Sequence, residues 1–270
     1  MKYSERVSQI VTQARGKSSI GVASSARQQD RTASRPFAVF DIDGTLIRWQ
    51  LYHAVVDKLA KKGLLGDIAH SKLHNARMVW KRREHSNAFH DYETNLIHIY
   101  ESALPTLSTK DFDYYVDEVA KKYKAQVYTF TRDLARKLKK SGYVLIAISG
   151  SHEELVRHIA QQYSFDIWVG SKYKRKGNNF TGEKEIASFD KKTVLQKIVK
   201  ENGLTYLNSY GVGDSKSDAP MLNVVDNPIA FNPDRELIHI AKSKNWKIVI
   251  ERKNVVYNLE ASENGKYFLV

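Results

Sequence analysis

Phe37-Ala38-Val39-Phe40-Asp41-Ile42-Asp43-Gly44-Thr45-Leu46 is the stretch of sequence that decides the fold. Its first four residues are apolar and predict a buried strand that ends at two aspartates. Gly44 lets the backbone turn tightly before a helical pattern begins. In an open α/β sheet, ligands bind outside the carboxyl ends of the strands. Asp41 and Asp43 therefore lie where chemistry can occur, although an Asp-Gly turn on its own is a common structural feature.

Three further groups of polar residues follow this first one along the chain. Ser149 and Gly150 come directly after the apolar run 144–148, and Asp214 ends the strand-like run 206–212. Asp218 lies one helical turn beyond Asp214, where an aspartate commonly caps a helix. Lys191 lies between these groups at the start of a predicted helix, and the adjacent Lys192 and the more distant Lys184 remain alternatives for the same role.

Taken in this order, the residues resemble the haloacid dehalogenase superfamily of phosphohydrolases, and most closely its phosphoserine-phosphatase-like branch (subfamily IB, with a helical C1 cap). The resemblance covers roughly residues 37–246. The first motif, DxDGT, is Asp41 to Thr45, and the second is Ser149. The third motif is best matched by Lys191, and the fourth, GDxxxD, runs from Gly213 to Asp218.

The resemblance implies catalytic roles for the two aspartates of the first motif. Asp41 would attack phosphorus and form an aspartyl-phosphate. Asp43 would protonate the leaving alcohol and then activate the water that hydrolyses the intermediate. The implied cofactor is Mg²⁺, held by the Asp41 and Asp214 side chains and by the Asp43 carbonyl.

The other motif residues are implied to bind phosphate or to support the site. Ser149 would donate a hydrogen bond to a phosphoryl oxygen, assisted by the amides of Gly150 and Ser151 at a helix N-terminus. Lys191 would balance the charge of the phosphate and the nucleophile. Asp218 would orient a metal-bound water or the surrounding loop.

Composition limits the class of protein. The chain has 270 residues, of which 42% are hydrophobic, and this suits one α/β domain with a smaller insertion. It contains no cysteine, which excludes disulfides and thiolate chemistry and fits the cytoplasm. No apolar run approaches the roughly 20 residues that a membrane span requires. The formal charge of +13 comes largely from lysines dispersed through helical segments, as expected for solvated helix faces.

The predicted fold is α/β, a Rossmann-like doubly wound parallel sheet with an inserted helical cap domain. Residues 1–35 read as a flexible arm, residues 36–47 and 127–252 as the core, residues 48–126 as the cap, and residues 253–270 as a C-terminal hairpin extension. Helical patterns in the cap cover residues 51–62, 68–83, 92–102 and 111–123. Within the core we expect a strand at 167–169 followed by a separate hairpin over 173–184. We also expect a helix over 217–225, and a capping-box pair of Ser151 and Glu154.

The substrate is predicted only as a small phosphorylated metabolite, and the sequence makes no prediction of oligomeric state. In the resembled phosphoserine phosphatases a Glu just after the first motif recognises the substrate, and Gln50 occupies that position here. Further lining candidates are Arg48, Trp49, Tyr52, Arg77, Trp80, Arg82 and Arg83. The alternative function is a polynucleotide-end phosphatase or a nucleic-acid-associated binding protein that uses the basic surface. A nucleic-acid partner is not favoured, because nucleic-acid sites cluster their basic residues.

Overall fold

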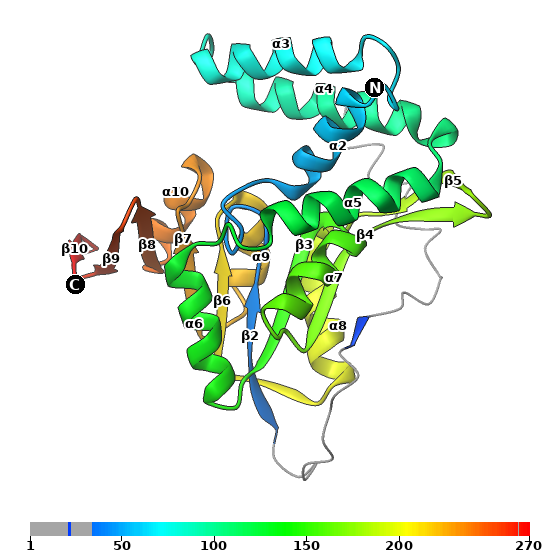
Figure 1. Cartoon of the computed structure of the whole chain (residues 1–270). Helices are drawn as coiled ribbons and strands as arrows, with labels where there is room; N and C mark the ends of the chain where they lie inside the picture. Colours follow the sequence, from blue (N-terminus) through cyan, green and yellow to red (C-terminus); the bar gives the residue numbers. More distant parts are fainter. Residues whose placement is uncertain (1–20, 23–33, 264) are drawn as a thin grey trace, which may run out of the picture.

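A single sheet organises the protein, which we describe from a computed structural model for residues 21–22, 34–263 and 265–270. In these residues the strand order is β1-β4-β3-β2-β6-β7-β8-β9-β10, with β5 paired to β4 (Figure 1). The strands from β4 to β8 in this order are parallel, and β1, β5, β9 and β10 are antiparallel to their neighbours. The strands are β1 (Gly21–Val22), β2 (Arg35–Phe40), β3 (Val144–His152), β4 (Ile167–Lys176), β5 (Asn179–Glu185), β6 (Leu204–Gly213), β7 (Asn227–Phe231), β8 (Lys247–Arg252), β9 (Val255–Ala261) and β10 (Tyr267–Leu269).

The central strand β2 is buried on both faces. Ala38 and Phe40 point into one apolar cluster, whereas Phe37 and Val39 point into a second cluster on the opposite face. This division follows from the alternation of side chains along a strand. Burying each of the two phenylalanines contributes roughly 1.5–3 kcal/mol. An apolar run without polar alternation therefore becomes the middle of a parallel sheet.

Helices cover both faces of this sheet. Apolar residues of α6 (Thr129–Lys140) and α7 (Glu153–Gln162) join the first cluster. Those of α8 (Lys191–Glu201), α9 (Ala219–Leu222) and α10 (Arg235–Ser243) join the second. The two 3₁₀ turns η2 (Ala187–Asp190) and η3 (Lys216–Asp218) precede α8 and α9. The sheet is therefore doubly wound, as predicted.

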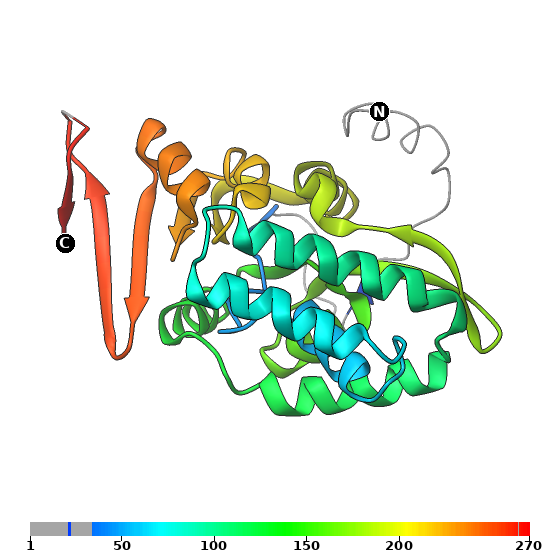
Figure 2. The same ribbon diagram turned by 90° about the horizontal axis from the view of Figure 1, so that it is seen from above.

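Residues 48–126, the predicted cap, are largely helical and lie over the carboxyl end of the sheet (Figures 1 and 2). They contain α2 (Leu51–Lys61), α3 (Ala69–Arg82), α4 (Ala88–Ala103), the 3₁₀ turn η1 (Leu104–Thr106) and α5 (Thr109–Tyr123). The chain enters and leaves the cap at one place, because Ile47 and Val127 form an antiparallel bridge. The amide of Arg48 also donates to the Gln126 carbonyl oxygen at 2.8 Å.

Glu251, at the end of β8, holds both cap linkers. Its carboxylate accepts the amides of Thr129 and Phe130, at 3.0 and 2.8 Å, and so caps α6 just beyond the second linker. It also accepts a hydrogen bond from Arg48 Nη2 at 2.5 Å, on the first linker. The side chain of Glu251 is only 2% exposed, so these three donors compensate for a buried charge. Arg48 is thereby placed at the hinge of the cap.

Some predicted local structure was wrong. The hairpin expected over 173–184 is present as the antiparallel pair β4–β5, but it is not separate from the strand expected at 167–169. Its first arm and that strand form one continuous strand, β4, because β3 pairs with β4 as far as His152 and Ser171 and β5 pairs with the remainder. The helix expected over 217–225 is divided into η3 and the short α9, because Pro220, in the first turn of α9, lacks the amide hydrogen that would bond back into the preceding turn. Most of the predicted arm of residues 1–35 lies outside the described residues.

Candidate active site

Asp41 and Asp43 follow β2 directly, at the end of the sheet that the cap covers. The amide of Asp41 still donates to the Val212 carbonyl oxygen of β6 at 2.9 Å, which fixes where the first carboxylate begins. Gly44 then turns the chain with a φ of +80°. A Cβ at this position would lie 2.1 Å from Asp214 Oδ2. Glycine is therefore required both by the backbone conformation and by the approach of Asp214.

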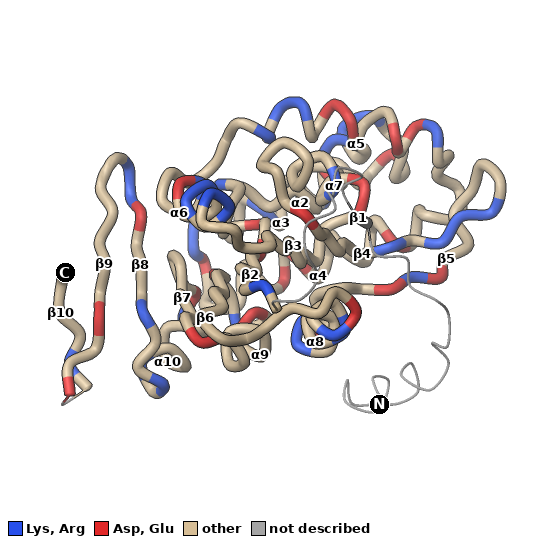
Figure 3. The backbone as a smooth tube through the Cα atoms, turned by 90° about the horizontal axis from the view of Figure 1, so that it is seen from below, with Lys and Arg blue, Asp and Glu red and all other residues tan. Residues whose placement is uncertain are grey.

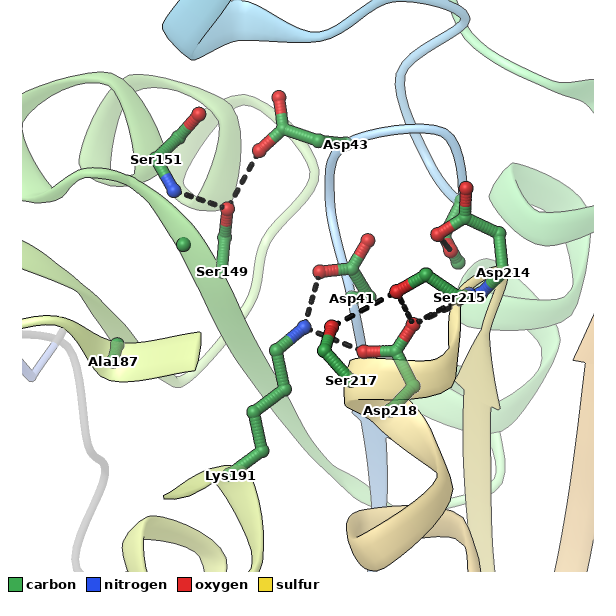
Figure 4. Close-up of polar contacts among 12 residues, drawn as sticks. Asp41, Asp43, Ser149, Ser151, Ala187, Lys191, Asp214, Ser215, Ser217 and Asp218 are labelled. Carbon is green, nitrogen blue, oxygen red and sulfur yellow. Dashed lines mark hydrogen bonds and ion pairs between the residues drawn. The ribbon is translucent and has the colours of Figure 1, made fainter. Parts of the chain in front are cut away.

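Asp41, Lys191 and Asp218 form a buried chain of ion pairs. Lys191 Nζ lies 2.6 Å from Asp41 Oδ1 and 2.6 Å from Asp218 Oδ1 (Figure 4). The three side chains are at most 6% exposed. Lys192 is exposed on the same helix. Of the three lysines that the sequence left open, Lys191 is the one that contacts the aspartate of the first motif, whereas Lys184 is bound to Glu101.

Asp43 is held by a different set of partners. Ser149 Oγ donates to its Oδ2 at 2.6 Å, and the amide of Leu51, the first residue of α2, donates to its Oδ1 at 2.5 Å. The same Ser149 Oγ accepts the amide of Ser151 at 3.0 Å. The Ser151 hydroxyl in turn accepts the amide of Tyr52 at 2.9 Å. The loop after β3 is thus bonded to Asp43 and to the start of the cap.

This use of Ser151 corrects the predicted capping box. The N-cap of α7 is His152, with no side-chain capping bond, because the Ser151 hydroxyl is directed toward the cap instead. Sequence reasoning also missed the amide of Leu51 as a partner of Asp43. The spacing of a capping box is satisfied by many sequences, and it does not report which way the hydroxyl points.

Asp218 supports the loop that carries Asp214. Its Oδ2 accepts the amides of Asp214 and Ser215 at 3.0 Å each, and also the Ser215 hydroxyl at 3.2 Å. The Thr45 hydroxyl donates to Asp214 Oδ1 at 3.3 Å. Asp218 therefore caps the turn η3, the structural role expected of an aspartate at this position, and also contacts Lys191.

Charge is unbalanced in this site. Burial raises the pKa of Asp41 to about 7, against the opposing effect of Lys191. Burial, together with the nearby Asp41 and Asp218 carboxylates, raises the pKa of Asp214 well above its usual value. Burial alone would lower the pKa of Lys191, but Asp218 and Asp41 raise it. A single ammonium group thus faces several carboxylates, and an additional cation would relieve their repulsion.

The donor set fits a hard divalent cation. Asp41, Asp214 and Asp218 each offer an oxygen, and these three atoms lie within 4.8 Å of one another. Asp218 already bonds Lys191 and the two loop amides, so Asp41 and Asp214 are the carboxylates better placed to bind a metal. Carboxylate and carbonyl oxygens are the ligands that Mg²⁺ prefers. The raised pKa values of both carboxylates provide the electrostatic reason to bind it.

The predicted substrate-lining residues of the cap differ in their distance from the site and in their bonding partners. Gln50 is the half-buried N-cap residue of α2, directly before Leu51. Arg48 is bound to Glu251, and Arg77 is bound to Asp57 inside the cap. Trp80 stacks on Tyr92, with ring centroids 5.5 Å apart. Gln50 therefore lies next to the residue that bonds Asp43, whereas Arg48, Arg77 and Trp80 have structural partners.

Comparison with known proteins shows the family of this chain. Residues 38–223 match the haloacid dehalogenase-like hydrolase family. The chain belongs to this family. The predicted membership of the haloacid dehalogenase hydrolases and the predicted α/β fold with a helical cap are confirmed.

Two curated relatives of this hydrolase are named phosphatases. A histidinol-phosphatase of Neisseria meningitidis is 28% identical over 222 residues, covering 78% of this chain and 97% of its own. A phosphoserine phosphatase of Archaeoglobus fulgidus is 23% identical, covering 81% of this chain and 57% of its own, so the chain spans little more than half of that relative.

Solved structures share the fold of this hydrolase. A Bordetella pertussis protein of unknown function has a TM-score of 0.65 at 21% identity, covering 81% of this chain and 99% of the other. A phospho-aspartyl intermediate analogue of phosphoserine phosphatase has a TM-score of 0.56 at 22% identity, covering 82% and 95%. Across the described part of the chain, no helix is long and apolar enough to cross a bilayer.

Proposed function

We propose that this hydrolase is a magnesium-dependent phosphatase of a small phosphate monoester and works through an aspartyl-phosphate on Asp41. The observation that carries the proposal is the different environment of the two aspartates. Asp41 bonds the Lys191 ammonium, whereas Asp43 bonds a hydroxyl and a helix-terminal amide. Two carboxylates in different environments can divide nucleophilic and acid–base roles.

The nucleophilic step uses the free oxygen of Asp41. Lys191 donates to Oδ1, which leaves Oδ2 to attack phosphorus. The new bond joins Oδ2 to phosphorus, and the bond from phosphorus to the ester oxygen breaks. Lys191 then stays beside the acyl oxygen of the intermediate. Mg²⁺ held by the Asp41 and Asp214 carboxylates and the Asp43 carbonyl would supply positive charge to the phosphoryl oxygens.

The acid–base step uses Asp43. Its Oδ2 accepts the Ser149 hydroxyl in the absence of substrate. When Ser149 donates instead to a phosphoryl oxygen, Oδ2 is released to carry the proton that the leaving alkoxide takes. The Asp43 carboxylate then removes a proton from the attacking water, whose oxygen displaces Asp41 from phosphorus. The Gly150 amide would assist Ser149 in binding the phosphate.

The substrate class is supported by three observations. The relatives' names refer to histidinol phosphate and phosphoserine, which are small phosphate monoesters. Asp41 and Asp43 are only 4% and 9% exposed beneath the cap, which suits a small enclosed substrate. Lysines and arginines of the described residues are spread over several elements among acidic residues (Figure 3). This distribution favours a metabolite over a polynucleotide.

A substrate screen tests the proposal. The purified protein is assayed for phosphate release from a panel of phosphorylated metabolites and a 5′-phosphorylated oligonucleotide, with Mg²⁺ and with EDTA. We expect Mg²⁺-dependent turnover of a metabolite that disappears in Asp41→Asn. The exposed Asp133→Asn variant is the matched control and should retain turnover. Turnover in folded Asp41→Asn, or in EDTA, would overturn the assignment.

A further inference from the structure

His152 is a buried core residue that meets three helices of the cap. Its ring stacks on the Tyr52 ring of α2, with centroids 5.0 Å apart and planes 7° apart. The Tyr100 hydroxyl of α4 lies 2.9 Å from its Nε2. The Phe112 ring of α5 packs edge-on at 5.0 Å. Because His152 belongs to β3, any opening of the cap must separate these contacts.

The same residue continues the predicted phosphate-binding loop. His152 follows Ser149, Gly150 and Ser151 without interruption and pairs with Ser171 of β4. The Ser171 hydroxyl donates to the Gly150 carbonyl oxygen at 2.7 Å. A displacement of His152 is therefore transmitted directly to the loop that bonds Asp43.

The surroundings of His152 require an uncharged imidazole. The residue has no exposed surface, and its Nδ1 has no hydrogen-bond partner among the described residues. Burial, with a smaller effect of Arg175, lowers the pKa of His152 to about 3. An imidazolium would place an N–H at Nδ1 without an acceptor, at a substantial desolvation cost.

The other charged and titratable groups around His152 do not supply a counterion. Tyr173 of β4 contacts the ring at 4.9 Å. Arg175, also of β4, is bound to Asp113 of α5 and Glu154 of α7. The Glu101 carboxylate of α4 is bound to Lys184 of β5. The nearby carboxylates therefore already have basic partners.

We propose that His152 is a positioning residue that couples closure of the cap to the phosphate-binding loop, and that only its uncharged form permits closure. Protonation at acid pH therefore opens the cap. The active site of the closed form is nearly inaccessible, so substrate entry requires such an opening in every turnover. His152 thus regulates the balance between the two states.

The size of the effect follows from proton linkage. In the open cap, His152 contacts water and titrates near its ordinary pKa of 6.5, whereas in the closed cap its pKa is about 3. The pKa of His152 is lower in the closed form than in the open form. Closure is therefore favoured at high pH and becomes weaker as the pH falls through 6.5. Between pH 7.5 and 5.5 the opening constant should increase about tenfold.

Hydrogen exchange of the Tyr52 amide tests this directly. The amide donates to Ser151 Oγ across the boundary between cap and core, so its protection reports opening of the cap. After correction for the intrinsic pH dependence, we expect about tenfold lower protection at pH 5.5 than at pH 7.5. The amide of Val39 in the core should not change. Equal Tyr52 protection at both pH values in the wild type would overturn the proposal without any variant.

Three variants identify the residue that causes the pH-dependent protection of the Tyr52 amide. His152→Phe keeps a stacking ring that cannot be protonated, so its Tyr52 protection should be independent of pH. His158→Gln is the matched control, because His158 also joins core to cap, through Asp117 at 2.8 Å. This variant should retain the tenfold fall. Tyr100→Phe should lower protection at both pH values and keep the fall.

Kinetics provide the functional readout. The ratio of kcat/KM between wild type and His152→Phe should fall by up to about tenfold from pH 7.5 to 5.5. Titration of Asp41 affects both proteins and cancels in this ratio. Loss of the pH effect in His158→Gln, or its persistence in folded His152→Phe, would assign the switch to another group and overturn the proposal.

Discussion

Lys191→Met removes an ammonium group that lies 2.6 Å from both Asp41 and Asp218 and replaces it with an apolar side chain of similar length. All three side chains are at most 6% exposed, so water cannot replace the lost partner. Breaking a buried ion pair of this kind costs about 3–5 kcal/mol. Lys191 makes two such pairs, but the expected cost is that of one pair, because Asp41 can respond by binding a proton. For a chain of this size the melting temperature should fall by roughly 10 °C.

The pH dependence of this loss has a definite sign. Lys191 lowers the pKa of Asp41, which is nevertheless raised to about 7, so the variant should raise it further. A carboxyl whose folded pKa is raised destabilises the protein at high pH, and the penalty shrinks as pH falls. The free-energy difference between wild type and Lys191→Met should therefore be largest near pH 8 and smaller at pH 5.

Urea denaturation in EDTA measures this difference, since a bound cation would offset the missing charge. Lys192→Met is the matched control, because Lys192 is adjacent and exposed, and its effect should stay within about 0.5 kcal/mol. A loss below about 1 kcal/mol for Lys191→Met, or a loss that does not vary with pH, would contradict the buried ion-pair chain.

Further predictions concern the metal, the acid, the hinge and the substrate. Because Mg²⁺ requires ionised Asp41, whose pKa is about 7, its affinity measured by calorimetry should rise about tenfold from pH 6 to pH 8; equal affinities would contradict this. Asp43→Asn should reduce turnover by roughly 10²–10⁴-fold for alkyl esters and by less for phenolic esters, and equal losses would remove its acid role. Glu251→Ala should cost about 2 kcal/mol in urea denaturation through the lost cap of α6, whereas exposed Glu260→Ala should have little effect. Gln50→Glu should change the ranking of substrates in the metabolite panel without changing the Mg²⁺ requirement, and an unchanged ranking would locate specificity elsewhere.

The sequence predicted the sheet and its strand ends well because both depend on local pattern. The run Phe37–Phe40 could only be a buried strand, and the position of Asp41 followed from it. The choice between Lys191 and Lys192 could not be made locally, because both fit the start of α8. Only the tertiary packing buries Lys191 against Asp218 and leaves Lys192 exposed.

Residues that join distant segments were the ones that sequence reasoning missed. Arg48 was predicted to line the substrate site, but its partner Glu251 lies on β8, far along the chain. His152 carried no motif, and its importance comes from rings contributed by α2, α4 and α5. The hydrophobic periodicity of the sequence does not predict which distant strand end or helix face will contact such a side chain.

The bridge between Ile47 and Val127 also bears on how such an enzyme can be rebuilt. An insertion whose two ends meet leaves the surrounding sheet undisturbed whatever its length. Each doubling of inserted length adds only about 0.6 kcal/mol of loop-closure entropy to folding. A foreign cap whose ends are similarly close could therefore be exchanged at these two positions, provided that Arg48 and Glu251 are kept. Exchanging the cap would then change the substrate preference without changing the reactive residues at the strand ends of the sheet.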